Sequence, residues 1–395
     1  MLDRRSFAFF AAAACAAPLR AQPQRPFAVG LLSQGDDDRY SPQTLQRGFP
    51  DAPGGRSEPA AQIALNDSLV TLQMAGRNAG QLVAVETPDA AALPGALQEL
   101  LRKGVQHVVL ELPAAGVAAV TAAARGKDVM LFNAAAPEDV LRGSQCAPEL
   151  LHTLPSHAMQ MDAIVQLLVA RKWNHPLVLV GPTPGDRLLH AAWQRSAKRF
   201  ALKPIGERPF KLSNDPRERD LGNVRLLTSE RDYDAVVVLD AQGEFASDVP
   251  YRTVLPRPVL GSNGLVAQAW SPLYERNGAP QLTRRFLRRA NRPMSSYDWA
   301  TWMAVRCAAE VVGAYNKSTI AQQVQALRQG AVAVDGYKGQ RLTFRGWDGQ
   351  LRQPLLLAHG GGVADVAPLE GFLHPRITLD TLGYDQPETA CKAPG

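Results

Sequence analysis

Short, almost entirely apolar segments alternate with longer segments of helical periodicity along most of this chain. The first series of predicted strands comprises 27–33, 81–86, 105–112 and 129–133. The predicted helices between them are 59–77, 91–103 and 116–124. A strand that is apolar along its whole length is typical of a parallel sheet with both faces covered by helices. The alternation therefore predicts an α/β fold built on doubly wound parallel sheets.

The alternation starts again after residue 155, which predicts a second lobe. Strands are expected at 177–180, 203–210, 235–239 and 259–261, and helices at 157–173, 186–200 and 217–229. Three further helices are expected at 282–290, 297–315 and 319–328. We assign 22–154 plus about 265–330 to lobe 1, and 155–264 plus about 331–395 to lobe 2 and a β-rich C-terminal tail. The predicted architecture is two lobes with a cleft between them.

Two connections carry their own signals. The segment 34–57 is polar and rich in Gly and Pro, so we interpret it as a loop between the first strand and the first helix. In the tail, Asp348-Gly349 stands between the strand-like segments 341–345 and 355–358. This dipeptide is a strong hairpin signal, and we expect the two segments to pair.

Residues 1–21 have the order of a secretory signal. A charged start with two arginines precedes the apolar run 7–17, which is too short to span a bilayer, and Ala21 ends the segment. Both the Sec and the twin-arginine route stay open, whereas a lipoprotein anchor at Cys15 is disfavoured because the expected Leu is missing. We therefore expect a periplasmic protein.

The rest of the chain indicates neither nucleic-acid binding nor a membrane span. Removing residues 1–21 leaves 40 basic and 36 acidic residues, and a net charge of +4 spread along the chain does not indicate nucleic-acid binding. No later apolar run is long enough for a membrane span.

Three cysteines remain after such a cleavage, and their contexts differ. Cys307 lies in a helical apolar pattern, where a buried free thiol is usual. Cys146 and Cys391 lie in loop-like segments. Because an oxidising compartment allows disulfides, elimination predicts a Cys146–Cys391 disulfide.

The motifs that would indicate an enzyme or a cofactor are incomplete. Neither a Gly-x-Gly-x-x-Gly sequence nor a lysine-bearing phosphate loop opens the first helix, which disfavours a dinucleotide. The His-Gly-Gly-Gly run 359–362 looks like a lipase oxyanion loop, but it lacks the Gly-x-Ser-x-Gly partner and is interpreted as a hairpin loop. Zinc-ligand spacings are also missing. We expect no catalytic residue, no metal and no cofactor.

Two charged clusters each keep two interpretations. Asp36, Asp37 and Asp38 form either a solvated acidic loop or a site for a hard cation. Five arginines around one predicted helix form either a solvated face or a docking site for an acidic partner or lipid headgroups. They are Arg284, Arg285, Arg288, Arg289 and Arg292.

An ordered set of short segments resembles the type I periplasmic binding proteins, in particular the branched-chain-amino-acid type of ABC-transporter substrate-binding protein. The segments are 260–264 after the last parallel strand, 297–300 at the start of the cleft helix, and 336–339 through 347–349 in the return hairpin. The resemblance extends from Phe27 to about Ala358. It implies two lobes that close on a ligand about a hinge.

Longer strings resemble one branch of this family, the substrate-binding proteins encoded with PQQ-dependent alcohol dehydrogenase systems. The strings are 141–143 with Cys146, 151–156, 229–234, 249–253, 347–354, 371–374 and 379–383. The resemblance implies a solute-binding protein of an ABC-type uptake system linked to PQQ-dependent alcohol oxidation, with an ABC permease as partner. The alternative is an accessory protein, outside transport, that docks to a periplasmic quinoprotein dehydrogenase or its cytochrome.

The sequence departs from the amino-acid binders of that family where they hold the two ends of the ligand. Pro113-Ala114-Ala115 and Ala134-Ala135-Ala136 stand in place of small hydroxyl residues, and Asn263 matches the acidic residue that meets the ammonium group. Alanine side chains donate no hydrogen bond and an amide has no charge, so we expect the fold without the amino-acid site.

Ligands of doubly wound sheets bind outside the carboxyl ends of the strands. This rule nominates six residues for ligand binding, the last of them on the hinge side: Gln34, Pro113, Asn133, Asp240, Asn263 and Tyr297.

Overall fold

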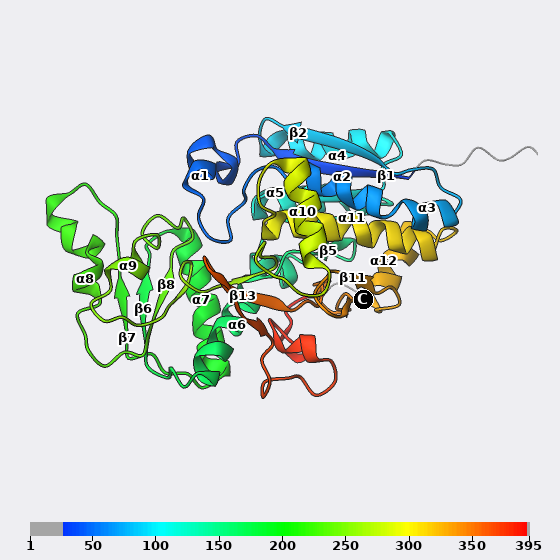
Figure 1. Cartoon of the computed structure of the whole chain (residues 1–395). Helices are drawn as coiled ribbons and strands as arrows, with labels where there is room; N and C mark the ends of the chain where they lie inside the picture. The colour runs from blue at the N-terminus through cyan, green and yellow to red at the C-terminus, as the bar shows by residue number, and fades with distance from the viewer. Residues whose placement is uncertain (1–26, 393–395) are drawn as a thin grey trace, which may run out of the picture.

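Residues 27–392 are described by the structure, which is a computed structural model. The predicted signal segment 1–21 lies outside the described residues. Two separate parallel sheets occupy the two ends of the molecule, each with its own helices (Figure 1). This arrangement confirms the predicted α/β fold with two doubly wound halves. No helix between residues 27 and 392 has the length and apolarity needed to cross a membrane.

The first sheet has five parallel strands in the order β2-β1-β3-β4-β5. Their bounds are Ala28–Gln34 (β1), Gln81–Thr87 (β2), His107–Glu111 (β3), Met130–Asn133 (β4) and Leu150–His152 (β5). Four of them were predicted. The fifth, Leu150–His152, was not predicted, and its pairing with β4 is what makes it a strand.

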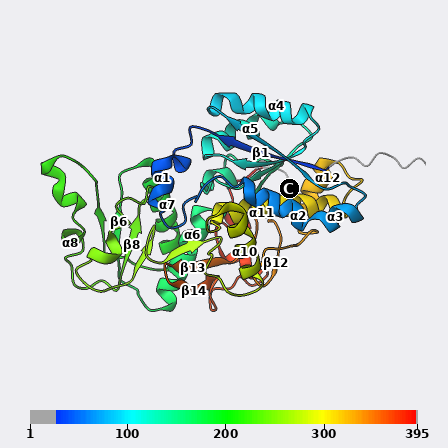
Figure 2. The same cartoon turned by 45° about the horizontal axis from the view of Figure 1, so that its top comes forward.

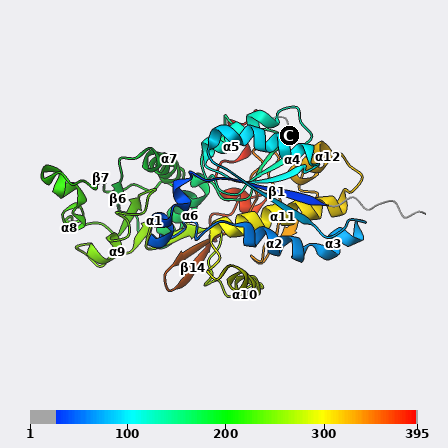
Figure 3. The same ribbon diagram turned by 90° about the horizontal axis from the view of Figure 1, so that it is seen from above.

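Helices cover both faces of this sheet (Figure 3). On one face lie Leu93–Arg102 (α4) and Ala114–Ala124 (α5). On the other lie Glu58–Asp67 (α2), Leu69–Met74 (α3) and the long Ser296–Ala314 (α11), with Ala279–Ala290 (α10) and Ile320–Arg328 (α12) beside them. The sequence predicted one helix over 59–77, but Ser68 interrupts it: its hydroxyl donates to the carbonyl of Ala64 at 2.8 Å and turns the chain between α2 and α3.

The second sheet has four parallel strands in the order β7-β6-β8-β9. Their bounds are Pro176–Val180 (β6), Gly206–Pro209 (β7), Ala235–Leu239 (β8) and Val259–Gly261 (β9). Helices His157–Ala170 (α6) and Pro184–Arg199 (α7) cover one face. The short helices Val224–Leu227 (α8) and Val249–Arg252 (α9) lie on the other side.

The helix predicted at 217–229 is wrong as a single element. A 3-10 helix, Pro216–Gly222, is followed by the one-turn helix α8. The break comes at Asn223, whose side-chain oxygen accepts from the backbone N–H groups of Arg225 and Leu226 and so starts a new helix.

The C-terminal tail contributes side chains to the hydrophobic cores of both lobes. Val266–Gln268 (β10), Leu355–His359 (β13) and Gly362–Ala367 (β14) form an antiparallel sheet, in the order β10-β13-β14, that packs toward α6. Phe344 and Leu351 instead join the core of the first sheet. The His-Gly-Gly-Gly run makes the β13–β14 turn, so its interpretation as a hairpin loop is confirmed.

The predicted pairing of 341–345 with 355–358 is wrong. A local hairpin does form around Asp348-Gly349, with Arg345 N–H donating to the carbonyl of Gln350 at 2.9 Å. The returning strand then runs beside β5, because Leu351 N–H donates to His152 at 2.9 Å. Arg341–Leu342 (β12) pairs with Val334–Asp335 (β11) instead.

A disulfide joins Cys146 to Cys391, with Cα atoms 5.6 Å apart, which is the pairing expected from the sequence. Cys307 is a free thiol that lies fully buried in α11. The bridge fastens the end of the described chain to the lobe that carries the first sheet.

Candidate functional site

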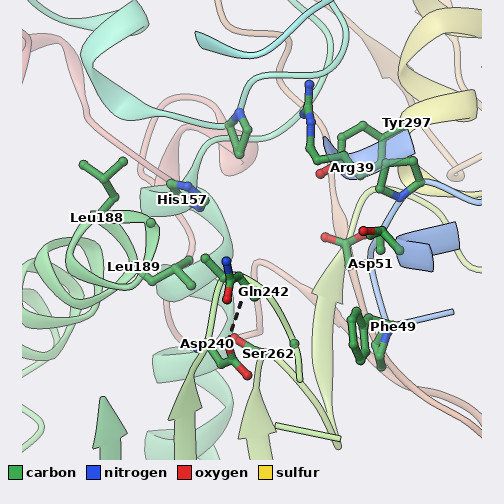
Figure 4. Close-up of a pocket in the computed structure, with 18 of the residues that line it drawn as sticks. Arg39, Phe49, Asp51, His157, Leu188, Leu189, Asp240, Gln242, Ser262 and Tyr297 are labelled. Atoms are coloured by element: carbon green, nitrogen blue, oxygen red, sulfur yellow. Dashed lines mark hydrogen bonds between the residues drawn. The ribbon is translucent and has the colours of Figure 1, made fainter. Parts of the chain in front are cut away.

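A cleft of about 820 Å³ lies between the two sheets. Its walls come from the segment after β1, from α6 and α7, from the loops after β8 and β9, and from the first turn of α11 (Figure 4). Both sheets therefore contribute the carboxyl ends of strands to one cavity, which is where doubly wound folds bind their ligands.

Four of the six nominated residues meet at this cleft. Gln34 ends β1, Pro113 precedes α5, Asp240 follows β8, and Tyr297 lies in the first turn of α11. A capping box holds that turn in place, since Ser295 and Asp298 each accept a hydrogen bond from the other's backbone N–H. Burial raises the pKa of Tyr297 to about 12, so its hydroxyl stays protonated at neutral pH.

Asn133 and Asn263 do not line the cleft, because neighbouring backbone groups occupy their side chains. The Asn133 oxygen accepts from the N–H groups of Ala135 and Ala136 at 3.2 and 2.9 Å, and its nitrogen donates to the carbonyl of Ala136 at 2.8 Å. The Asn263 amide donates to Ala246 at 3.0 Å and accepts from Gly264 at 2.7 Å. Both residues shape turns.

The segment 34–57, interpreted from the sequence as a plain loop, contains Pro42–Arg47 (α1) and reaches across to the second lobe (Figure 2). Arg47 pairs with Glu244 at 2.8 Å. Phe49 lies against Gly243, whose φ of +76° and missing side chain are both needed there, since a Cβ would come within 2.7 Å of the ring. The role of these residues does not follow from local sequence patterns, because a Gly- and Pro-rich segment predicts a loop without indicating what it contacts.

Asp51 lies at the end of this crossing segment, where it contacts α6 and α11. Its carboxylate accepts from the Ser296 hydroxyl at the start of α11 and from the Gln160 amide of α6, the latter at 2.8 Å. Burial raises the pKa of Asp51 to about 7, although both hydrogen bonds and the nearby Lys338 favour the ionised form. Asp51 is therefore partly protonated at neutral pH.

Arg39 and Asp37 form an ion pair on the first-lobe wall. The guanidinium donates to both carboxylate oxygens, with Nη2 2.7 Å and Nε 3.0 Å from them, and a further N–H donates to the carbonyl of Ala135. The same group lies 5.7 Å from the centre of the Tyr297 ring. Ala135 belongs to the segment 134–136, which stands in place of the small hydroxyl residues of the amino-acid binders. Arg39 therefore lies next to the turn where those hydroxyl groups were expected.

Asp240 organises the opposite wall. Its two oxygens accept from the N–H groups of Gln242 and Ala246 at 3.1 and 2.9 Å, and its own N–H donates to the Ser262 hydroxyl at 2.9 Å. Burial raises the pKa of Asp240, and the backbone donors oppose that shift.

Between residues 27 and 392, no three or more His, Cys, Asp or Glu side chains gather closely enough to hold a metal ion. Within the Asp36–Asp38 run, Asp37 is buried against Arg39, whereas Asp36 and Asp38 are exposed at the cleft.

The arrangement resembles solved structures of periplasmic binding proteins. A branched-chain amino acid ABC transporter periplasmic ligand-binding protein from Burkholderia xenovorans superposes with a TM-score of 0.71 at 15% identity, covering 93% of this chain and 99% of that one. A branched-chain amino acid transporter substrate-binding protein from Streptococcus pneumoniae, in complex with isoleucine, gives 0.62 at 15%, covering 87% and 99%. A solute-binding protein of an ABC transporter from Rhodopseudomonas palustris, in complex with 3,4-dihydroxybenzoic acid, gives 0.58 at 12%, covering 84% and 92%.

These likenesses show that the chain has the type I periplasmic-binding fold. No family model matches the sequence, and no curated protein matches it.

Proposed function

We propose that this protein is a periplasmic solute-binding protein that holds a small organic ligand between its two lobes. The observation that carries the proposal is the cleft of about 820 Å³ at the carboxyl ends of strands from both sheets. Its volume lies in the range of small-molecule sites, roughly 300–1,000 Å³. The isoleucine and dihydroxybenzoate complexes of the structural neighbours support it.

We place the protein in an ABC-type uptake system linked to PQQ-dependent alcohol oxidation, with a permease as its partner. The support is the resemblance of the long strings given above. Three of those strings meet in space, since Arg142 donates to Gln350 at 2.9 Å and to the carbonyl of Leu154 at 2.9 Å. The three strings therefore form one buried contact between the first lobe and the returning tail.

Free branched-chain amino acids should not be the ligand. The backbone N–H groups of Ala135 and Ala136, which remain there in place of hydroxyl donors, are already bonded to Asn133. Asn263, which would face the ammonium group, is bonded to Ala246 and Gly264. A zwitterion that enters a closed cleft must have both charges paired, and neither Asn263 nor the segment 134–136 has a free group to pair them.

Isothermal titration with leucine, isoleucine and valine tests this expectation. We expect dissociation constants in the millimolar range or weaker, since each tenfold loss corresponds to about 1.4 kcal/mol and several anchors are missing. A micromolar constant for any of the three would show that other groups, such as Asp240 or the Asp36–Asp38 run, supply the missing charge.

A thermal-shift screen against a library of small organic molecules tests the function itself. A ligand that binds only the folded protein raises the melting temperature by linkage, by an amount that grows with its concentration. An accessory protein that docks to a quinoprotein dehydrogenase or its cytochrome would ignore the whole library and bind that protein instead. That pair of results would replace the proposal with the alternative.

A further inference from the structure

Carboxyl groups greatly outnumber cations on the wall of the cleft. Seven acidic residues line it: Asp36, Asp37, Asp38, Asp51, Glu138, Asp240 and Glu244. The two arginines that line it are already engaged, Arg39 with Asp37 at 2.7 Å and Arg47 with Glu244 at 2.8 Å. The other five carboxyl groups make no ion pair within the described chain, and burial raises the pKa of one of them, Asp51, to about 7.

Two acceptor atoms at this wall also lack a hydrogen-bond donor among residues 27–392. Gln34 is 7% exposed, and its side-chain oxygen is one of them. The nitrogen of the same amide donates to the Asp36 carboxylate at 2.6 Å. The second atom is Oε2 of Glu138, which is buried. Both oxygens are buried beneath the surface of this wall, the Gln34 oxygen toward Gly116 of α5, so they add negative partial charge behind the carboxylates and do not themselves contact a ligand in the cleft.

The rest of the cavity suits an apolar body of modest size. Phe49 and Tyr297 lie on the first-lobe side, and Leu188 and Leu189 of α7 face them across the cleft (Figure 4). Leu188 is 46% exposed, which leaves apolar surface available for a ligand. Aromatic rings also attract cations through their faces.

We propose that the ligand of this cleft is a small organic amine, protonated at neutral pH, with its ammonium group among the acidic side chains and its carbon skeleton against this apolar surface. The inference rests on the proposed solute-binding function and names its ligand class. A bare metal ion fits less well, because no three acidic, His or Cys side chains of the described chain converge closely enough to hold one. An organic cation is larger than a metal ion, so carboxylates that do not converge on one point can still stabilise it.

Matched molecules that differ only in the charged group test the proposal. One set is 2-phenylethylamine, 2-phenylethanol and phenylacetate; a second is 3-methylbutylamine, 3-methylbutanol and 3-methylbutanoate. We expect the amine of at least one set to bind at least tenfold more tightly than its alcohol, and the acid to bind most weakly. Amine binding should weaken as salt rises, because screening reduces the attraction.

The possible outcomes separate the two proposals. An alcohol or an acid that binds as tightly as its amine would overturn the preference for cations while leaving the solute-binding function intact. Amines that produce no thermal shift while other library molecules do would overturn it as well. If no molecule of the library raised the melting temperature, both the solute-binding function and this inference would be refuted.

Two variants locate the charge preference. Glu138→Gln and Asp38→Asn should each weaken amine binding, by about tenfold for Glu138→Gln because it replaces a charged acceptor with a neutral one. Neither should weaken binding of the matched alcohol. Glu275→Gln is the control, since Glu275 is exposed, lies outside the cleft and changes the net charge equally. Equal losses for amine and alcohol would show that the variants disturb the shape of the cleft, which contradicts the proposal.

Discussion

Asp51 connects the two lobes, because its carboxylate accepts hydrogen bonds from Gln160 of α6 and Ser296 of α11. Its φ of +55° is a left-handed conformation that Asp and Asn adopt more readily than most residues. Asn at this position therefore preserves the backbone, removes the titrating group and keeps one of the two acceptor oxygens.

The Asp51→Asn variant should lack the part of the pH dependence of the free energy of unfolding that comes from Asp51. Burial raises the pKa of Asp51 to about 7, so between about pH 4 and 7 the folded protein binds more protons than the unfolded chain. The free energy of unfolding of the wild-type protein should therefore fall, relative to that of the variant, as the pH rises through this range. Each pKa unit corresponds to about 1.4 kcal/mol.

Urea unfolding of both proteins at intervals between pH 4 and 8 measures this difference. Asp232→Asn, at an exposed position, is the control and should follow the wild type. Parallel curves for the wild type and Asp51→Asn would contradict the assignment of a raised pKa to this residue.

Among the elements, the C-terminal tail is the one that depends most on contacts distant in sequence. Buried ion pairs hold it, since Asp380 accepts from Arg345 at 2.9 Å and from Arg352 at 2.8 Å. The Cys146–Cys391 disulfide, which spans 245 positions, then fastens its end. These contacts lie away from the cleft, so they support the lobe without touching the ligand wall.

The double variant Cys146→Ser/Cys391→Ser should melt at a lower temperature and keep the ligand affinity of the wild type. A crosslink over so long a loop stabilises by up to about 4–5 kcal/mol in the chain-entropy model, because it restricts the unfolded chain. Calorimetry measures the loss, and Cys307→Ala controls for removal of a cysteine without a crosslink. Non-reducing peptide mapping that finds both wild-type thiols free would refute the bond.

At the scale of the whole molecule, the two lobes are linked by the chain between β5 and α6, by its return between β9 and α10, and by the tail between Leu351 and β13. The segment 34–57 adds a further contact between them. Closure about such links buries a ligand between rigid halves. The proposed amine should therefore reduce the radius of gyration in small-angle scattering.

The scattering measurement is made with 2-phenylethylamine at saturating concentration, if that is the amine that binds. Glu138→Gln at the same concentration, below its own saturation, should show a smaller reduction. Binding by titration without any change in scattering would mean that the ligand enters a cleft that is already closed, and the hinge would then have no part in binding.

The sequence by itself determined the α/β class, eight of the nine strands of the two parallel sheets and the disulfide pairing. Each of these follows from local information: apolar runs such as 235–239 are long enough to show their period, and Cys307 is separated from the other cysteines by its helical context. The rule that ligands bind outside the carboxyl ends of strands also nominated Gln34, Pro113 and Asp240, and all three line the cleft, as does Tyr297 at the start of α11.

Only the tertiary structure decided where side chains point and which distant segments meet. Asn133 and Asn263 follow strands as the rule requires, yet neighbouring backbone groups take up their amides. Asp51 and Gln160 are 109 positions apart, and their contact depends on how segment 34–57 crosses to the second lobe. Hydrophobic periodicity reports burial along one element, whereas a binding site depends on the directions of polar groups from several elements, which are set when the lobes pack together.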